Sequence, residues 1–260
     1  NLWLATDHAF KSAVESMLIK QSILKNATQT EKLDDFWKVK PIVLIEDNKR
    51  DALDLDAWKT RAAKLSGIFR EYPEIYQSSI EFDGMASTSY HANTEGTAIR
   101  YPDHFNNLKV RAASIAPDGT TVRDAWIAHS LRIADMPADG ELEKGIREVA
   151  ANVKALAAAP IGESYSGPVV FEPLAGAQLL GQMIGDNLRP VRKPLNQPGR
   201  TLPIPSSDFE TRLGARVLPD FFDVTDDATA TTHAGRPLLG HYRTDLEGVA
   251  PVPVKVIEKG

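Results

Sequence analysis

The sequence contains no cysteine, which excludes disulfide bonds and zinc sites with thiolate ligands. It has no long apolar run and no cluster of lysine and arginine. Its 35 acidic residues outnumber its 30 basic ones, for a net charge of -5. A membrane-spanning helix needs about 18 apolar residues in sequence, and nucleic-acid-binding domains usually carry a basic face. The composition therefore predicts neither a membrane nor a nucleic acid as a partner.

The rest of the composition is that of a globular protein, with 42% hydrophobic and 25% charged residues among 260. The predicted elements run from helices to strands, then to a helix and further strands, without regular strand–helix alternation. This order favours an α+β fold, with mixed or antiparallel sheets and packed helices. The chain starts at Asn1 and stops after one strand, Val256–Gly260. We therefore expect a fragment of a longer protein, which could have carried a targeting signal before Asn1.

Four helices are predicted from apolar residues spaced three and four apart. Their expected ranges are 7–26, 54–72, 141–156 and 175–188. Thr6 or Asp7 is the expected cap of the first helix, Asp54 or Asp56 of the second and Asp139 of the third, since a side-chain oxygen can accept from a free backbone N–H. Pro73 is expected to end the second helix.

The strands are predicted from short apolar runs and from alternation. The expected strands are 41–45 and 168–171, both buried, and 78–90, 98–101, 108–115, 121–128 and 249–257. Asn93-Thr94-Glu95-Gly96 is a turn-like group. Pro117-Asp118-Gly119 predicts a hairpin turn, because proline presets φ and glycine accepts a positive φ. Residues 189–207 hold five prolines and predict an extended connector.

Common catalytic and metal motifs are absent from the sequence. The six histidines show no HExxH or HxxxH spacing, and no phosphate-binding glycine loop or GxSxG elbow occurs. His233 and His241 are weak metal candidates across a loop, although surface histidines are the more common interpretation. The carboxylates Asp223, Asp226 and Asp227 are interpreted as a solvated acidic turn.

Several blocks of the second half resemble a known family. The first is Ser166–Glu172, of the form "GPVLFE", and a small-residue stretch and a helix follow at Ala175–Gly181. Downstream, Leu239–Val249 and Val256–Gly260 resemble "DDEGV" and "LIENG" segments. In the first half the best matches are 69–75 and 93–96, the latter resembling "NSEG". These blocks are similar to the TldD/PmbA family of peptidase-related proteins, whose members are also described as candidate modulators of DNA gyrase.

The resemblance implies a site that this chain has lost. Active family members carry HExxxH on the helix after the "PVV" strand, where both histidines bind zinc and the glutamate polarises water. The corresponding residues here are Gly181-Gln182-Met183-Ile184-Gly185-Asp186. Gly181 and Asp186 stand at the histidine positions, and Gln182 stands at the glutamate. The resemblance thus implies no catalytic residue and no cofactor in this chain, with zinc expected only in an active partner.

This departure is similar to the PmbA (TldE) branch of the family. The resemblance implies a non-catalytic subunit that assists proteolysis or peptide maturation, a homodimer or a heterodimer with a TldD-like chain, a peptide or unfolded-protein substrate, and a cytoplasmic location. Export stays open. Two alternatives also stay open: an active metal-dependent peptidase with a displaced site, and a peptide-binding module that adds a strand at 249–257. We expect an N-terminal α+β domain at 1–160 and the start of a β-rich C-terminal domain at 161–260.

Overall fold

The computed structural model describes residues 1–26, 34, 37–49, 51–189, 203 and 206–260. These residues form two compact units, both of which draw on segments from either side of residue 160. Unit 1 consists of 1–37, 167–227 and 253–260, and unit 2 of 38–166 and 228–252. The fold is α+β with mixed and antiparallel sheets, as the sequence predicts. The predicted connector at 189–207 lies almost wholly outside the described residues.

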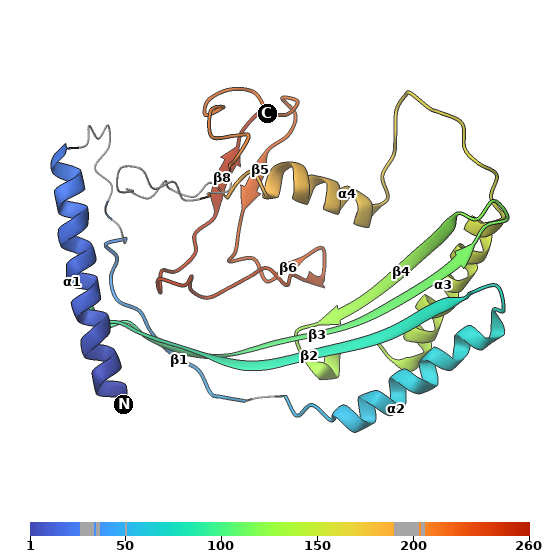
Figure 1. The fold of residues 1–260 in the computed structure, drawn as a ribbon, viewed down its shortest axis with the longest axis horizontal. Helices are drawn as coiled ribbons and strands as arrows, with labels where there is room; N and C mark the ends of the chain where they lie inside the picture. Colours follow the sequence, from blue (N-terminus) through green and yellow to red (C-terminus); the bar gives the residue numbers. More distant parts are fainter. Residues whose placement is uncertain (27–33, 35–36, 50, 190–202, 204–205) are drawn as a thin grey trace. The chain divides into compact units, whose positions relative to one another are not determined.

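Unit 2 is built on a four-stranded sheet. The long strands β2 (Gln77–Ala92), β3 (Ala98–Ile115) and β4 (Thr121–Ser130) are antiparallel, and β1 (Val43–Ile45) adds in parallel to the start of β3. Figure 1 shows the long strands as a curved sheet with α2 (Leu55–Ser66) and α3 (Asp139–Ala158) along the same face. The strand predicted at 41–45 is present, but Val43 and Ile45 are exposed, so its predicted burial is wrong.

Strand β3 is continuous where the sequence predicts two strands. Pro102 falls within this strand. Proline has no N–H to donate to a neighbouring strand, and it is therefore disfavoured in a strand that is paired on both sides. The pairing explains why the strand is not broken. β1 pairs with β3 only at 98–100 and β4 only from Asn106 onward, so Pro102 has β2 alone as a neighbour. The proline therefore occupies a local sheet edge.

The two turns of this sheet follow the predicted turn chemistry. At 93–97 the Asn93 side chain accepts hydrogen bonds from the N–H groups of Glu95 and Thr97, and Gly96 has a φ of 101°. Between β3 and β4, Gly119 has a φ of 87° and donates to Ala116 O. Both glycines occupy the left-handed region that other residues avoid, and this confirms the hairpin predicted at Pro117–Gly119.

The core of unit 2 lies between the sheet and the two helices. Trp58 and Leu65 of α2, and Leu142, Ile146, Val149 and Val153 of α3, pack against Leu108 and Val110 of β3. Asp54 caps α2 by accepting from Ala57 N, as predicted. The helix ends earlier than predicted, because a 3₁₀ turn at Gly67–Glu71 precedes Pro73. Its buried Ile68 and Phe69 still face the core.

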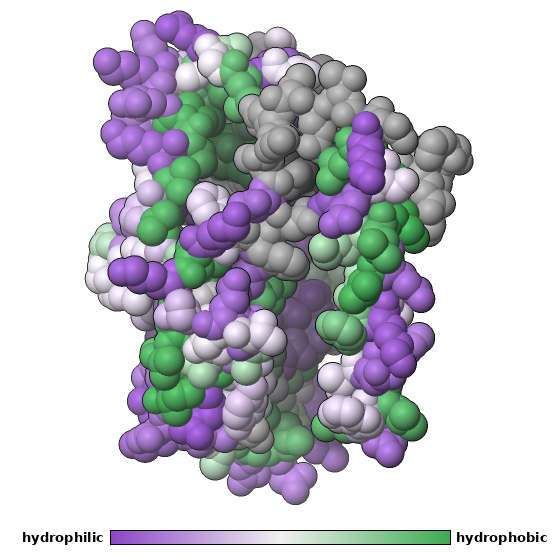
Figure 2. All heavy atoms as spheres, turned by 90° about the vertical axis from the view of Figure 1, so that its left-hand side faces the viewer, coloured by the Kyte–Doolittle hydropathy of each residue, from purple (hydrophilic) through white to green (hydrophobic). Residues whose placement is uncertain are grey.

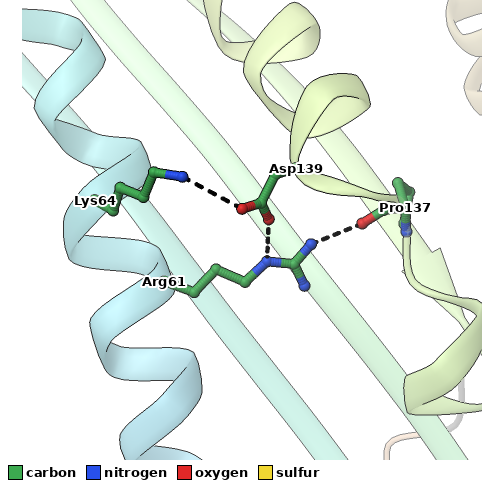
Figure 3. A network of polar contacts seen from close by, with 4 residues as sticks. All are labelled: Arg61, Lys64, Pro137 and Asp139. Atoms are coloured by element: carbon green, nitrogen blue, oxygen red, sulfur yellow. Dashed lines mark hydrogen bonds and ion pairs between the residues drawn. The ribbon is translucent and has the colours of Figure 1, made fainter.

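Asp139 does not cap α3, contrary to the prediction. Ala138 is the N-cap residue, and the carboxylate of Asp139 turns to α2 instead. Figure 3 shows Arg61 donating from Nε to Asp139 at 2.6 Å and from Nη2 to the carbonyl of Pro137 at 2.9 Å, with Lys64 Nζ 3.5 Å from the same carboxylate. The Arg61 guanidinium also lies over the Trp58 ring. These contacts join α2 to the start of α3.

The Arg61 hydrogen bond lowers the pKa of Asp139 below its usual range. A lowered carboxyl pKa stabilises the fold above the unfolded pKa of about 3.9, and that contribution is lost as the pH falls through the folded value. Asp139→Asn is expected to cost about 1 kcal/mol or less at pH 7, since both partners are partly exposed. In urea unfolding, the difference from the wild type should shrink at pH 3. Lys64→Gln keeps the shorter contact between Arg61 and Asp139, so it should lower the free energy of unfolding by less. A stability difference between Asp139→Asn and the wild type that does not change with pH would contradict this role of Asp139.

Unit 1 begins with α1 (Leu2–Asn26), which starts before the predicted Asp7. Thr6 and Asp7 therefore lie inside the helix, where Thr6 Oγ1 donates to Leu2 O and Asp7 pairs with Lys11, and neither is a cap. The apolar residues whose spacing predicts this helix are exposed, among them Phe10, Met17 and Leu18. Figure 2 shows exposed hydrophobic side chains interleaved with hydrophilic ones on the face that it draws.

The remaining strands are short. In unit 1, β5 (Val224–Asp226) pairs with β8 (Val254–Ile257), and in unit 2, β6 (Thr232–His233) pairs with β7 (Arg236–Pro237). The predicted strand at 168–171 is wrong. That segment has no strand pairing, and Val170 is 96% exposed. An apolar run becomes a buried strand only where neighbouring strands pair with it.

None of the helices in the described residues is long and apolar enough to cross a membrane.

Candidate functional site

The positions singled out by sequence lie at the end of α4 (Pro173–Leu180). Glu172 is the N-cap residue and Pro173 begins the helix, where its missing N–H is not needed. After Leu180 the helix widens into a π-helical turn at Gly181–Gly185. Asp186 N donates to Gly181 O at 3.0 Å, the bond between residues five apart that defines such a turn. Sequence periodicity predicts a helix over 175–188 but gives no sign of this turn.

The π turn bears directly on the spacing of the predicted motif. Residues five apart point to different sides of an α-helix with 3.6 residues per turn, whereas a π turn has more residues per turn and brings them closer together. Gly181 and Asp186 therefore lie nearer to the same side of the helix than they would in an α-helix. Two histidines at these positions could reach one metal ion. The local backbone suits an HExxxH spacing even though this sequence carries none of its functional side chains.

The side chains at these positions have little capacity for zinc chemistry. Gly181 has no side chain, and Gln182 carries a neutral amide that cannot serve as a general base near pH 7. Asp186 is exposed and its carboxylate accepts a hydrogen bond from Arg189 at 3.2 Å. A single exposed carboxylate paired with arginine supplies one oxygen ligand, whereas protein zinc sites use three or four protein ligands.

The π turn is anchored by one buried side chain and by hydrogen bonds to a later segment. Ile184 is buried, and Asn187 connects the turn to a later segment. Asn187 O accepts from Ser207 Oγ at 2.5 Å, and Asn187 Oδ1 accepts from Asp208 N at 2.8 Å. A cavity of about 420 Å³ in unit 1 starts at Leu188 and continues along 209–217 and 256–260. Its lining includes none of Gly181, Gln182 and Asp186.

The two histidine candidates lie in unit 2. His233 is in β6 and is exposed. His241 is partly buried, and its Nδ1 lies 2.8 Å from Leu238 O. A carbonyl only accepts, so Nδ1 carries the proton and Nε2 alone could bind a metal. Within the described part of the chain, no group of three or more His, Asp or Glu side chains is placed to hold a metal ion.

The predicted edge strand at 249–257 is shorter in the structure. Only Val254–Ile257 forms β8, and Val252 and Val254 are both exposed. β8 has β5 as its partner in a two-stranded sheet. Its other edge is therefore not paired within the described residues.

In two of the sequence blocks that resemble the family, the structure explains why particular residues are needed. In the "DDEGV"-like block, Asp245 Oδ1 accepts from the N–H groups of Glu247 and Val249, both at 2.9 Å, and Gly248 has a φ of 81°. In the "LIENG"-like block, Gly260 is buried, and its N–H donates to Phe222 O at 2.9 Å. A Cβ atom at Gly260 would lie 2.2 Å from Leu218 O, so only glycine fits there.

Comparison with known proteins agrees with this architecture. Residues 164–260 match the PmbA/TldA metallopeptidase C-terminal domain family. Two crystal structures have a similar fold, and both are described as candidate modulators of DNA gyrase. The protein from Bacteroides thetaiotaomicron is 16% identical with a TM-score of 0.56, over 83% of this chain and 46% of its own. The protein from Thermotoga maritima is 14% identical with a TM-score of 0.61, over 88% of this chain and 50% of its own. No curated protein matches the sequence.

The chain thus has an α+β fold similar to that of the two solved structures. Residues 164–260 belong to the C-terminal domain family that the PmbA/TldA metallopeptidases share. It spans about half the length of the two solved structures, at 46% and 50% of their chains.

Proposed function

We propose that this chain is part of a non-catalytic, PmbA-like subunit that assists an active family member in proteolysis or peptide maturation. The observation that carries the proposal is the turn at 181–186. Its backbone suits a pair of histidines five residues apart, yet the residues there are Gly181, Gln182 and Asp186. Neither a zinc pair nor a general base is present among them.

The chemistry explains why such a chain would need a partner. Zinc-dependent hydrolysis requires an open metal position and a base that takes a proton from the bound water. A chain without the ligand pair and without the base contributes neither. It can still bind and position a peptide substrate, and we propose that role. The active partner would be a TldD-like chain that carries HExxxH and binds the zinc, in a heterodimer.

Zinc content is the direct test of this division of labour. The full-length protein is purified alone and then together with an HExxxH-bearing family member from the same source. We expect substoichiometric zinc and no peptide hydrolysis from the protein alone, and one zinc per active partner in the complex. Elemental analysis and a fluorogenic peptide assay measure the two quantities. Stoichiometric zinc with peptide hydrolysis by the protein alone would overturn the proposal.

The two alternatives have less support in the described residues. A displaced metal site would use Asp186, His233 or His241. Asp186 is paired with Arg189, and Nδ1 of His241 is used by Leu238 O. A peptide-binding module would use the unpaired edge of β8, which is only four residues long. That edge could also serve the proposed subunit and does not favour a separate function.

A further inference from the structure

The outer face of the unit 2 sheet, opposite α2 and α3, carries a cavity of about 480 Å³. It lies where β2 begins, β3 ends and β4 begins. In each strand alternate residues face away from the helices. Since Val110 and Ala112 face the core, Arg111 and Ala113 face outward, as do their neighbours Ser79, Arg123 and Ala125. The small side chains Ser79, Ala113 and Ala125 make the hollow, and longer ones border it.

The charges around this cavity are unbalanced. Along the outer face, Lys109 pairs with Asp83 and Arg111 pairs with Glu81, each at 3.0 Å. Arg123 makes no ion pair with any residue that the structure describes, and its side chain is exposed. The neighbouring Asp124 does not neutralise it, because that carboxylate accepts from Asn152 Nδ2 of α3 at 2.9 Å, on the helix side. The cavity is thus bordered by one paired and one unpaired guanidinium.

Such a site suits a small anionic group attached to a chain. A guanidinium binds a carboxylate through two parallel N–H donors, and its affinity rises where part of the surroundings is apolar. The volume lies in the range of ordinary ligand sites. Gln77 and Ser79, which both line the cavity, add neutral hydrogen-bonding groups that can pair with a peptide backbone.

We propose that this cavity binds the C-terminal carboxylate of a peptide, with Arg123 as the main anion-binding residue. The inference rests on the proposed function, in which the chain holds a peptide for an active partner. Arg111 lies beside the carboxylate, and its pairing with Glu81 holds it in place. The small side chains of Ser79, Ala113 and Ala125 leave room for the terminal residue.

The test uses the full chain and two fluorescein-labelled penta-alanine peptides, one with a free C-terminus and one amidated. Fluorescence anisotropy is expected to show binding of the free acid that is at least about tenfold tighter than binding of the amide, because the amide lacks the charge that pairs with arginine. Arg123→Gln should remove most of this difference. Arg70→Gln is the matched control, since Arg70 is also exposed and unpaired among the described residues of unit 2 but lies on the 3₁₀ turn outside the cavity.

Equal binding of the two peptides, or an effect of Arg70→Gln as large as that of Arg123→Gln, would overturn the proposal. Displacement of the peptide by inorganic phosphate at far lower concentration than by acetate would also overturn it, since the site would then be a phosphate site. The readout needs neither zinc nor hydrolysis. If the chain proves to be an active zinc enzyme, the subunit proposal fails while the carboxylate assignment is judged on its own.

Discussion

Gly145→Ala is expected to destabilise unit 2 by about 1–3 kcal/mol, the usual cost of forcing extra volume into a packed core. Gly145 lies in α3 where the helix crosses the Trp126 ring of β4. A Cβ atom there would lie 2.6 Å from two ring carbons, closer than real contacts allow. Trp126 packs against the core and cannot turn away freely. Thermal or urea unfolding followed by tryptophan fluorescence measures the loss.

The matched control for this prediction is Gly140→Ala in the same helix. A Cβ atom at Gly140 would have no heavy atom of another segment within 4 Å. Alanine has the higher helix propensity, so this change should be neutral or stabilise by up to about 1 kcal/mol. Opposite signs at the two positions identify the contact with Trp126 as the cause. Equal effects would mean that helix propensity alone matters and that α3 does not approach β4 so closely.

The second large effect concerns the π turn. Introducing Gly181→His and Asp186→His together is expected to raise zinc affinity by at least about tenfold over the wild type, or about 1.4 kcal/mol. The reason is that the π turn brings residues five apart closer together than an α-helix does, so that both imidazoles can reach one ion. Isothermal titration with zinc measures the change. Adding Gln182→Glu is not needed for binding, since that residue acts on water rather than on the metal.

The control moves one histidine by a single position, combining Gly181→His with Gly185→His. Residues four apart are neighbours in either kind of turn, whereas residues five apart come close only in the π turn. Zinc binding by the 181/185 pair together with no gain from the 181/186 pair would show that the turn is α-helical in solution. That result would remove the structural part of the argument for a lost HExxxH site, although the missing side chains would remain missing.

The sequence was enough to predict which side chains occupy the candidate site, but not the backbone conformation that carries them. The residue types at 181, 182 and 186 alone exclude a histidine pair and a glutamate base. Helical periodicity cannot distinguish an α turn from a π turn over five residues, because the distinction depends on which backbone hydrogen bonds form, among them the bond from Asp186 N to Gly181 O. The cavity beside Arg123 also had no sequence signal. It depends on strand register, which places side chains from three strands together.

The sequence by itself determined the α+β class, the periodic faces of α2 and α3, the Asp54 cap and the turns at Asn93 and Gly119, because each depends on residues close along the chain. Only the tertiary structure decided which segments distant in the sequence pair or pack with one another. Residues 168–171 have no strand pairing, and β3 continues through Pro102 because the proline lies at a local sheet edge. Asp139 pairs with Arg61 and does not cap a helix. Local patterns fix which conformations a segment favours, whereas pairing and packing with distant segments decide which of them is stable.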